Sequence, residues 1–506
     1  MSLSRVVTRA ALGVTAPQVT VEVHISSGLP GLSLVGLPEK TVKEARDRVR
    51  SAIINSGFAF PAKRVTVNLA PADLPKEGGR FDLPIAIAIL AASEQLPDVK
   101  LAQFEFLGEL ALSGALRGVQ GAIPAAMAAK EAGRKLILPT ENALDVGLVV
   151  QGESLVAESL MEICAFLLQQ RSLATGSTAE PDNQEKSEDL RDIIGQQQGK
   201  RALEIAAAGG HNLLLIGPPG TGKTMLAMRL TGLLPPLSDR EALECATIAS
   251  IVNSGGVYKQ WRKRPFRLPH HSSTLYALIG GGSIPQPGEI TLAHNGVLFL
   301  DELPEFSRKT LDALREPLET GEITISRARA KVTWPAQFQL VAAMNPSPTG
   351  HYQGSHNRST PQQTLRYLSR LSGPFLDRFD LSLEIPLLPA GMLSRPQTET
   401  ESSAEVRIRV LEARQRQLTR QGKVNALMSN AEVQRWCELQ NEDAEWLENV
   451  LIHLGLSVRA WQRLLKVSRT IADLAEEEAL TRAHLQEALS YRGMDRMMVH
   501  LHKNLE

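Results

Sequence analysis

The chain has 506 residues, of which 43% are hydrophobic, and its 55 lysine and arginine residues are balanced by 55 aspartate and glutamate residues. This length provides material for about three domains, and the composition is that of a globular protein. The charge balance excludes a chain that binds nucleic acid as a polycation throughout, although it is compatible with a local basic patch that is offset by acid elsewhere.

Cysteine usage and apolar runs indicate the compartment. The three cysteines, Cys164, Cys245 and Cys437, are far apart and form no C-x-x-C pair, so we expect neither a disulfide framework nor a cysteine-based zinc site. The longest apolar run, residues 83–92, contains Pro84 and is about half as long as a membrane span. We therefore expect a cytoplasmic protein without a membrane partner.

The N-terminal region alternates between strand-like and helix-like segments, which predicts an α+β domain over residues 1–168. The strand-like runs are residues 18–24, 64–68 and 135–138, and the helix-like stretches are residues 85–92 and 122–132. Residues 169–188 are polar and nearly free of large apolar side chains, so they predict a linker.

After this linker, short apolar runs alternate with helix-like stretches, as in an α/β domain with a parallel sheet whose strands are buried on both faces. The apolar runs are residues 212–216, 296–300 and 338–343, and a helix-like stretch precedes them at residues 201–208. From about Val406 onward the pattern is helical, most clearly over residues 458–475. We expect an α/β domain over residues 189–390 and a helical domain over residues 391–506.

The first apolar run is followed by a complete phosphate-binding motif, G-x-x-x-x-G-K-[ST], between a predicted strand and a predicted helix. Its residues are Gly217, Pro218, Pro219, Gly220, Thr221, Gly222, Lys223 and Thr224. Glycines allow backbone N–H groups to surround a phosphate, and the N-terminus of the following helix adds its dipole. We expect Lys223 to reach the β- and γ-phosphates of ATP and Thr224 to hold Mg²⁺.

The second apolar run ends in two adjacent carboxylates, Asp301 and Glu302. At the carboxyl end of a parallel strand, Asp301 is expected to hold Mg²⁺ and Glu302 to act as the general base for the attacking water. Taken alone, the pair is also compatible with a solvated loop. The third run leads to Asn345, which either orients the water and senses the γ-phosphate or only caps the strand before Pro346.

These motifs resemble those of the AAA+ ATPases, and more closely those of the YifB/ComM family of magnesium-chelatase-like proteins. The matching stretches occur in family order over most of residues 189–492 and include IIGQQQGKRALEIAAAGGHNLLLIGPPGTGKT, PGEITLAHNGVLFLDELPEF, SGPFLDRFDL and LSVRAWQRLLKVSRTIADLA. The resemblance implies an AAA+ core over residues 189–390 and a helical lid after it. It also implies that Asn345 is the sensor 1 residue, Arg378 an arginine finger and Arg459 the sensor 2 residue.

An arginine finger reaches the ATP of a neighbouring subunit, so the resemblance implies a hexameric ring with ATP at the subunit interfaces. The alternatives are a salt bridge of Arg378 within its own loop and a surface position of Arg459.

The N-terminal region resembles the Lon-protease-like domain of the ribosomal S5 superfamily in the stretches PKEGG, GELALSG and AGRKLILP. A Lon-type peptidase needs a serine nucleophile and a lysine base. At the corresponding places this chain has Arg80-Phe81-Asp82 and Ile123-Pro124. We therefore expect no peptidase activity, and contacts of this domain with DNA or with neighbouring subunits.

Basic residues at the tip of a predicted β-hairpin, residues 323–333, are candidates for DNA binding. The chain also resembles the branch of AAA+ ATPases shared by magnesium chelatase and the replicative MCM helicases, in which a hairpin at this place projects into the pore of the ring. Arg327, Arg329 and Lys331 would contact phosphates there without reading the base sequence. A second basic segment, residues 259–282, is a weaker candidate, and a solvated basic loop is the alternative for both.

The resemblance implies an enzyme that hydrolyses ATP with Mg²⁺ and acts as a hexameric DNA motor, with branch migration during recombination, as in natural transformation, as its task. One alternative is a chelatase-like motor that remodels a protein partner and is indifferent to DNA. Another is an interaction protein whose ring is only a scaffold, in which case the substitution Glu302→Gln would leave function intact.

Overall fold

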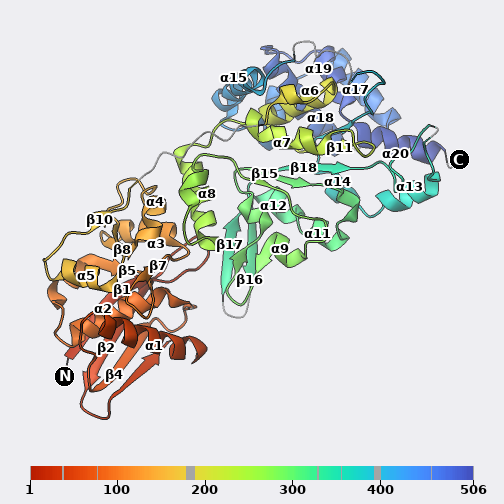
Figure 1. Cartoon of the computed structure of the whole chain (residues 1–506). Coiled ribbons are helices and arrows are strands. Elements are labelled where there is room, and N and C mark those ends of the chain that lie inside the picture. The colour runs from red at the N-terminus through yellow and green to blue at the C-terminus, as the bar shows by residue number, and fades with distance from the viewer. Residues whose placement is uncertain are drawn as a thin grey trace.

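The computed structural model describes residues 2–36, 39–76, 78–177, 188–326, 330–354, 356–392, 400–456 and 458–504. We call residues 2–177 the N-terminal unit, residues 188–392 the central unit and residues 400–504 the C-terminal unit. Each of the first two units has its own large sheet, and the third is helical (Figure 1). The predicted α/β fold with a central parallel sheet and a helical C-terminal region is confirmed.

The N-terminal unit is built on an eight-stranded mixed sheet. In spatial order its strands are β10 (Ala174–Thr175), β9 (Leu155–Ala157), β8 (Lys135–Pro139), β5 (Phe104–Phe106), β1 (Ser2–Arg9), β2 (Gln18–Ser26), β4 (Arg64–Ala70) and β3 (Gly31–Val35). Its helices are α1 (Glu39–Asn55), α2 (Asp82–Ala92), α3 (Ala122–Glu131), α4 (Ala143–Val146) and α5 (Leu160–Leu167). Because α2 packs on β1 and β2 and is buried at every position, it has no polar face. The three predicted strands correspond to β2, β4 and β8.

The central unit contains a five-stranded parallel sheet in the order β12 (Phe266–Arg267), β15 (Val297–Leu300), β18 (Gln339–Met344), β11 (Leu213–Ile216) and β19 (Leu381–Glu384). Successive side chains of β11 lie on opposite faces of the sheet and belong to different hydrophobic clusters. Leu213 and Leu215 lie on one face, and Leu214 and Ile216 lie on the other. This arrangement confirms the three predicted strands as doubly buried. The edge strands β12 and β19 were not predicted.

Helices cover both faces of this sheet (Figure 1). The helices of the central unit are α6 (Gln197–Gly209), α7 (Lys223–Leu233), α8 (Asp239–Val252), α9 (Leu275–Ile279), α10 (Glu289–Leu292), α11 (Arg308–Asp312), α12 (Arg315–Thr320), α13 (Pro361–Leu368) and α14 (Gly373–Leu376). The predicted hairpin is confirmed, because β16 (Glu322–Ser326) pairs antiparallel with β17 (Lys331–Pro335). Ile325 and Trp334 are buried on its inner face.

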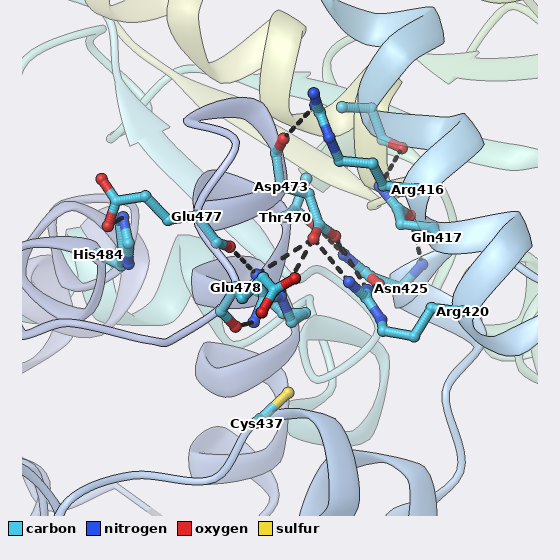
Figure 2. A network of polar contacts seen from close by, with 12 residues as sticks. Arg416, Gln417, Arg420, Asn425, Cys437, Thr470, Asp473, Glu477, Glu478 and His484 are labelled. Atoms are coloured by element: carbon cyan, nitrogen blue, oxygen red, sulfur yellow. Dashed lines mark hydrogen bonds and ion pairs between the residues drawn. The ribbon is translucent and has the colours of Figure 1, made fainter.

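The C-terminal unit is a bundle of helices around a buried polar network. Its helices are α15 (Ser403–Gln421), α16 (Asn430–Trp436), α17 (Asn441–His453), α18 (Val458–Leu474), α19 (Arg482–Ser490) and α20 (Gly493–Lys503). The Asp473 carboxylate, near the end of α18, is 2% exposed and accepts hydrogen bonds from Arg420 at 2.7 and 3.0 Å, Asn425 at 2.8 Å and Arg469 at 3.2 Å (Figure 2). The network ties α18 to α15 and to the segment that follows α15.

The N-terminal and central units meet where α3 packs on α8 (Figure 1). The backbone N–H of Gly121 donates to the carbonyl of Ser250 at 2.6 Å, and that of Tyr258 donates to Oδ1 of Asp145 at 2.9 Å. Residues of both units also share one hydrophobic cluster. The junction is therefore a packed interface with directed hydrogen bonds.

Candidate functional site

The phosphate-binding loop joins β11 to α7, and its glycines adopt backbone angles that other residues avoid. The angle φ is +77° at Gly220 and +86° at Gly222, the N-cap residue of α7. At Gly217 a Cβ atom would lie 2.4 Å from the carbonyl oxygen of Ile385, so only glycine fits. The predicted strand, loop and helix are thus arranged in the way that phosphate binding at a helix N-terminus requires.

Lys223 lies folded against this loop. Its ammonium donates to the carbonyl oxygens of Gly217 and Pro218 at 2.8 Å each, and to Oδ1 of Asn345 at 3.4 Å. Burial lowers the pKa of Lys223, and the nearby Asp301 carboxylate partly opposes this shift. The structure therefore places the predicted sensor 1 residue beside the predicted phosphate-binding lysine.

Thr224 and Asp301 face each other at the carboxyl ends of the strands. Oγ1 of Thr224 donates to Oδ2 of Asp301 at 2.9 Å, and the backbone N–H of Glu302 donates to Oδ1 of the same carboxylate at 2.8 Å. Two adjacent ligands of octahedral Mg²⁺, each about 2.1 Å from the metal, are about 3.0 Å apart. The hydroxyl and carboxylate oxygens therefore already have the separation that a shared Mg²⁺ ion needs.

Glu302 leaves the same strand end with a positive φ of +52°, which is uncommon for a residue other than glycine. One oxygen of its half-exposed carboxylate, Oε2, lies 2.9 Å from Nδ1 of His271. The ring of His271 lies against that of His270, with 4.2 Å between the centroids. Sequence reasoning treated His271 only as part of a basic segment, because no spacing rule connects it to a carboxylate 31 positions later.

The two arginines assigned by resemblance lie in one arginine-rich cluster. Burial lowers the pKa of Arg378, and the positive charges of Arg315, Arg459 and Arg463 lower it further. The guanidinium of Arg378 forms an ion pair with Glu319 of α12 rather than with an acid of its own loop. Among the described residues, none of its hydrogen bonds or ion pairs reaches the phosphate-binding loop of its own chain.

The buried network of the C-terminal unit extends to the loop that carries Arg378. Oγ1 of Thr470 lies 2.7 Å from Nε2 of His211, and Nδ1 of His211 lies 2.9 Å from Oδ2 of Asp380. Thr470 also accepts a hydrogen bond at 3.0 Å from Asn425, the partner of Asp473 in Figure 2. This chain of contacts fixes α18, where Arg459 lies, relative to the loop that follows α14.

The residues predicted to contact DNA are only partly placed. Arg327 and Arg329 lie outside the described residues, whereas Lys331 is exposed at the start of β17. The inner face of the hairpin packs against the turn that follows β1, where a Cβ atom on Gly13 would lie 2.6 Å from Val332. The hairpin is therefore attached to the N-terminal unit as well as to the central unit.

The second basic segment is largely engaged within the protein. Arg264 donates to the carbonyl oxygens of Pro235 at 2.6 Å and Asn295 at 2.7 Å. Arg267 forms a bidentate ion pair with Glu289 at 2.6 and 2.8 Å. These contacts give both arginines a structural role, so the segment is not retained as a DNA contact.

Sequence reasoning also missed Gln196, which precedes α6. Its side-chain N–H₂ group donates to the carbonyl oxygens of Thr221 at 3.1 Å and Pro386 at 2.9 Å. This amide joins the phosphate-binding loop to the segment after β19. The only signal in the sequence was its position within a stretch that resembles the family.

A cavity of about 1070 Å³ opens beside the predicted catalytic residues. Glu302 and Asn345 line one side of it, and Arg358, Arg366 and Arg370 also line it. Sequence reasoning singled out none of these three arginines, because they belong to a short helix and its flanking loops and match no motif.

Comparisons with known proteins agree with this geometry. Three family models match, described as "Magnesium chelatase, subunit ChlI" over residues 189–393, "Subunit ChlI of Mg-chelatase" over residues 21–142, and "Magnesium chelatase, subunit ChlI C-terminal" over residues 400–492. Among the residues that the structure describes, no helix is both long enough and apolar enough to cross a membrane.

Relatives match over the full chain. YifB of Escherichia coli (strain K12) is 66% identical over 505 residues, covering 100% of both chains. The competence protein ComM of Haemophilus influenzae is 60% identical over 503 residues, covering 98% of this chain and 99% of that one. The magnesium-chelatase 38 kDa subunit of Cereibacter sphaeroides is 25% identical over 210 residues, which is 38% of this chain and 57% of that one. The chain therefore belongs to the YifB/ComM family of magnesium-chelatase-like AAA+ proteins.

Proposed function

We propose that this protein hydrolyses ATP with Mg²⁺ and uses the energy, as a hexameric ring, to move along DNA and drive branch migration. The observation that carries the ATPase part is the convergence of Lys223, Thr224, Asp301 and Asn345 at the carboxyl ends of three adjacent parallel strands. Ligands of open α/β sheets bind at this edge.

In this proposal, each residue has one task in hydrolysis. Lys223 exchanges its contacts with loop carbonyls for the β- and γ-phosphates, and Thr224 and Asp301 hold Mg²⁺, which neutralises phosphate charge when bound. Glu302 accepts a proton from the attacking water after its contact with His271 opens. Asn345 orients that water, because its amide already lies beside Lys223.

The arginine cluster supports catalysis between subunits. Among the described residues, Arg378 makes no hydrogen bond or ion pair with its own phosphate-binding loop, and the positive charges of Arg315, Arg459 and Arg463 act on it. The γ-phosphate of a neighbouring subunit would relieve that repulsion, and Arg378 and Arg459 would then stabilise the transition-state charge. A finger that acts on the next subunit needs a head-to-tail assembly, and the resemblance to ring-forming AAA+ proteins is the basis for the proposed hexamer.

The proposal that the motor moves along DNA is supported by the hairpin and by a relative. Lys331 is exposed beside a tip whose sequence adds Arg327 and Arg329, so six copies would line a ring with basic side chains while each subunit stays neutral overall. The relative named as a competence protein is 60% identical to this chain. We therefore propose that the DNA is a recombination intermediate formed during natural transformation.

The test of the DNA assignment is the double substitution Arg329→Ala and Lys331→Ala. ATP hydrolysis without DNA should persist, whereas its stimulation by branched or single-stranded DNA should be lost, because phosphate contacts supply sequence-independent affinity. The matched control is Arg240→Ala, which removes an exposed arginine of the same unit away from the cavity beside the catalytic residues. Equal DNA stimulation in the double variant and the wild type would contradict the assignment.

A second candidate is a motor that remodels a protein partner, as the match to a magnesium-chelatase subunit suggests. This candidate predicts that a protein stimulates hydrolysis and that DNA has no effect. The same ATPase measurement, made with and without branched DNA, distinguishes the two candidates.

A further inference from the structure

A cavity of about 680 Å³ lies at the junction of the N-terminal and central units, separate from the predicted ATP site. The N-terminal unit contributes Arg80, Glu109 and Gly121 to its wall, and the central unit contributes Ile251 and Ser254, at and just beyond the end of α8. Cavities of this size at domain interfaces commonly hold small organic ligands. The cavity therefore has the dimensions of a binding site.

Arg80 is a buried cation that forms no ion pair with any residue that the structure describes. It is 9% exposed, and among the described residues neither Nε nor Nη2 has a hydrogen-bond partner. Burial lowers the pKa of Arg80 to about 10, and no acidic neighbour counteracts this. Buried charged groups are normally paired, so an unpaired guanidinium in a cavity wall indicates a missing anion.

The N-terminus of α3 presents a second positive potential at the same place. Its N-cap residue is Gly121, with φ +69°, and no side chain caps the helix. A Cβ atom on Gly121 would lie 3.6 Å from Nη1 of Arg80, so the guanidinium lies next to the helix terminus. A cation beside the positive end of a helix dipole is unfavourable unless an anion lies between them.

We propose that this cavity binds a small organic anion, whose phosphate or carboxylate group is held between the guanidinium of Arg80 and the N-terminus of α3. Arg80 and Glu109 are the ionisable side chains among the residues that line the cavity. Glu109 repels a second negative charge and accepts hydrogen bonds, so the ligand has one anionic end and hydroxyl or amino donors elsewhere. Bound there, it contacts both units and strengthens their junction.

The resemblance to Lon-type peptidases would put their catalytic pair at this site. The two stretches that replace the serine and the lysine, at Arg80 and next to Gly121, do come together, but as a guanidinium beside a helix terminus. A guanidinium stays protonated at neutral pH and is no nucleophile. The inference is therefore binding without a covalent step, and it does not depend on the proposed DNA motor.

The experiment uses the full-length protein with saturating ADP, so that the phosphate-binding loop is filled. Isothermal titration with inorganic phosphate, ribose 5-phosphate and lactate should show binding of at least one probe, and the preferred probe identifies the oxyanion. The substitution Arg80→Met should weaken that binding about tenfold or more, because hydrogen bonds to a charged group are lost. Arg5→Met, which removes a mostly exposed arginine of the same unit outside the cavity wall, should leave it unchanged.

A second variant keeps the proposal testable if Arg80→Met does not fold. Glu109→Gln removes the repulsive charge from a partly exposed position and should strengthen binding of the preferred probe by a few-fold. Failure of all three probes to bind the wild type, or equal binding by wild type and Arg80→Met, would overturn the proposal. So would an unchanged or lower affinity in Glu109→Gln.

Discussion

The arrangement of Arg378 predicts that two inactive variants restore each other's activity. Arg378→Ala removes the proposed finger, and Lys223→Ala removes the phosphate-binding lysine of the same chain. Loss of an arginine finger lowers the hydrolysis rate by about 10³- to 10⁵-fold, so each variant alone should be almost inactive. Because the guanidinium of Arg378 pairs with Glu319 and, among the described residues, makes no hydrogen bond or ion pair with its own phosphate-binding loop, the proposed site takes one residue from each of two neighbouring subunits.

The size of the recovery follows from the composition of mixed rings. In rings assembled from equal amounts of both variants, about one quarter of the interfaces combine an intact Lys223 with an intact Arg378 across the boundary. Steady-state ATP hydrolysis should therefore recover to about one quarter of the wild-type rate after the variants are unfolded, mixed and refolded together, if sites act independently. No recovery in rings shown to contain both variants, or wild-type activity of Arg378→Ala alone, would refute the reasoning.

Three further predictions concern other parts of the site. Asp473→Ala leaves two arginines of the buried network without their acid and should cost about 3–5 kcal/mol, seen as faster amide hydrogen exchange in α18; unchanged exchange would contradict the network's role. His271→Ala frees the Glu302 carboxylate and should raise ATP turnover without DNA about two- to tenfold, whereas a fall would mean that the histidine assists catalysis. Because burial lowers the pKa of Lys223, this side chain loses its charge at a lower pH than an exposed lysine does. As the pH is raised, ATP affinity should therefore begin to fall before pH ~10.4, and a fall that begins only above pH ~10.4 would contradict this.

The elements that sequence reasoning located are those with a strong local pattern. The apolar runs that became β11, β15 and β18 and the long helix α18 were all predicted, because doubly buried strands and amphipathic helices leave distinct patterns. The edge strand β12 has only two residues, and β19 interrupts its leucines with Ser382 and Glu384, so neither forms a continuous apolar run. Their strand character comes from pairing with neighbours that are distant in sequence.

In the site, too, residues with a contiguous sequence motif were predicted, and contacts between distant segments were not. The phosphate-binding loop and Asp301 were found because strand, loop and helix are contiguous, and the structure brings Thr224 and Asp301 to 2.9 Å. The contact of His271 with Glu302 and the anion cavity at Arg80 depend on segments that only tertiary packing brings together. The net charge of zero likewise gave no sign that Arg378 and Arg459 lie in one cluster, because composition carries no information on position.

The measurement that tests the central claim most directly is the resolution of a three-strand recombination intermediate by the purified protein. Strand products on a gel are followed together with ATP turnover, for the wild type and for Glu302→Gln. The account predicts that the wild type resolves the intermediate only with ATP and Mg²⁺ and hydrolyses ATP faster with branched DNA, whereas Glu302→Gln binds ATP and does neither. An intermediate left unresolved by the wild type, with ATP turnover unchanged by DNA, would contradict it.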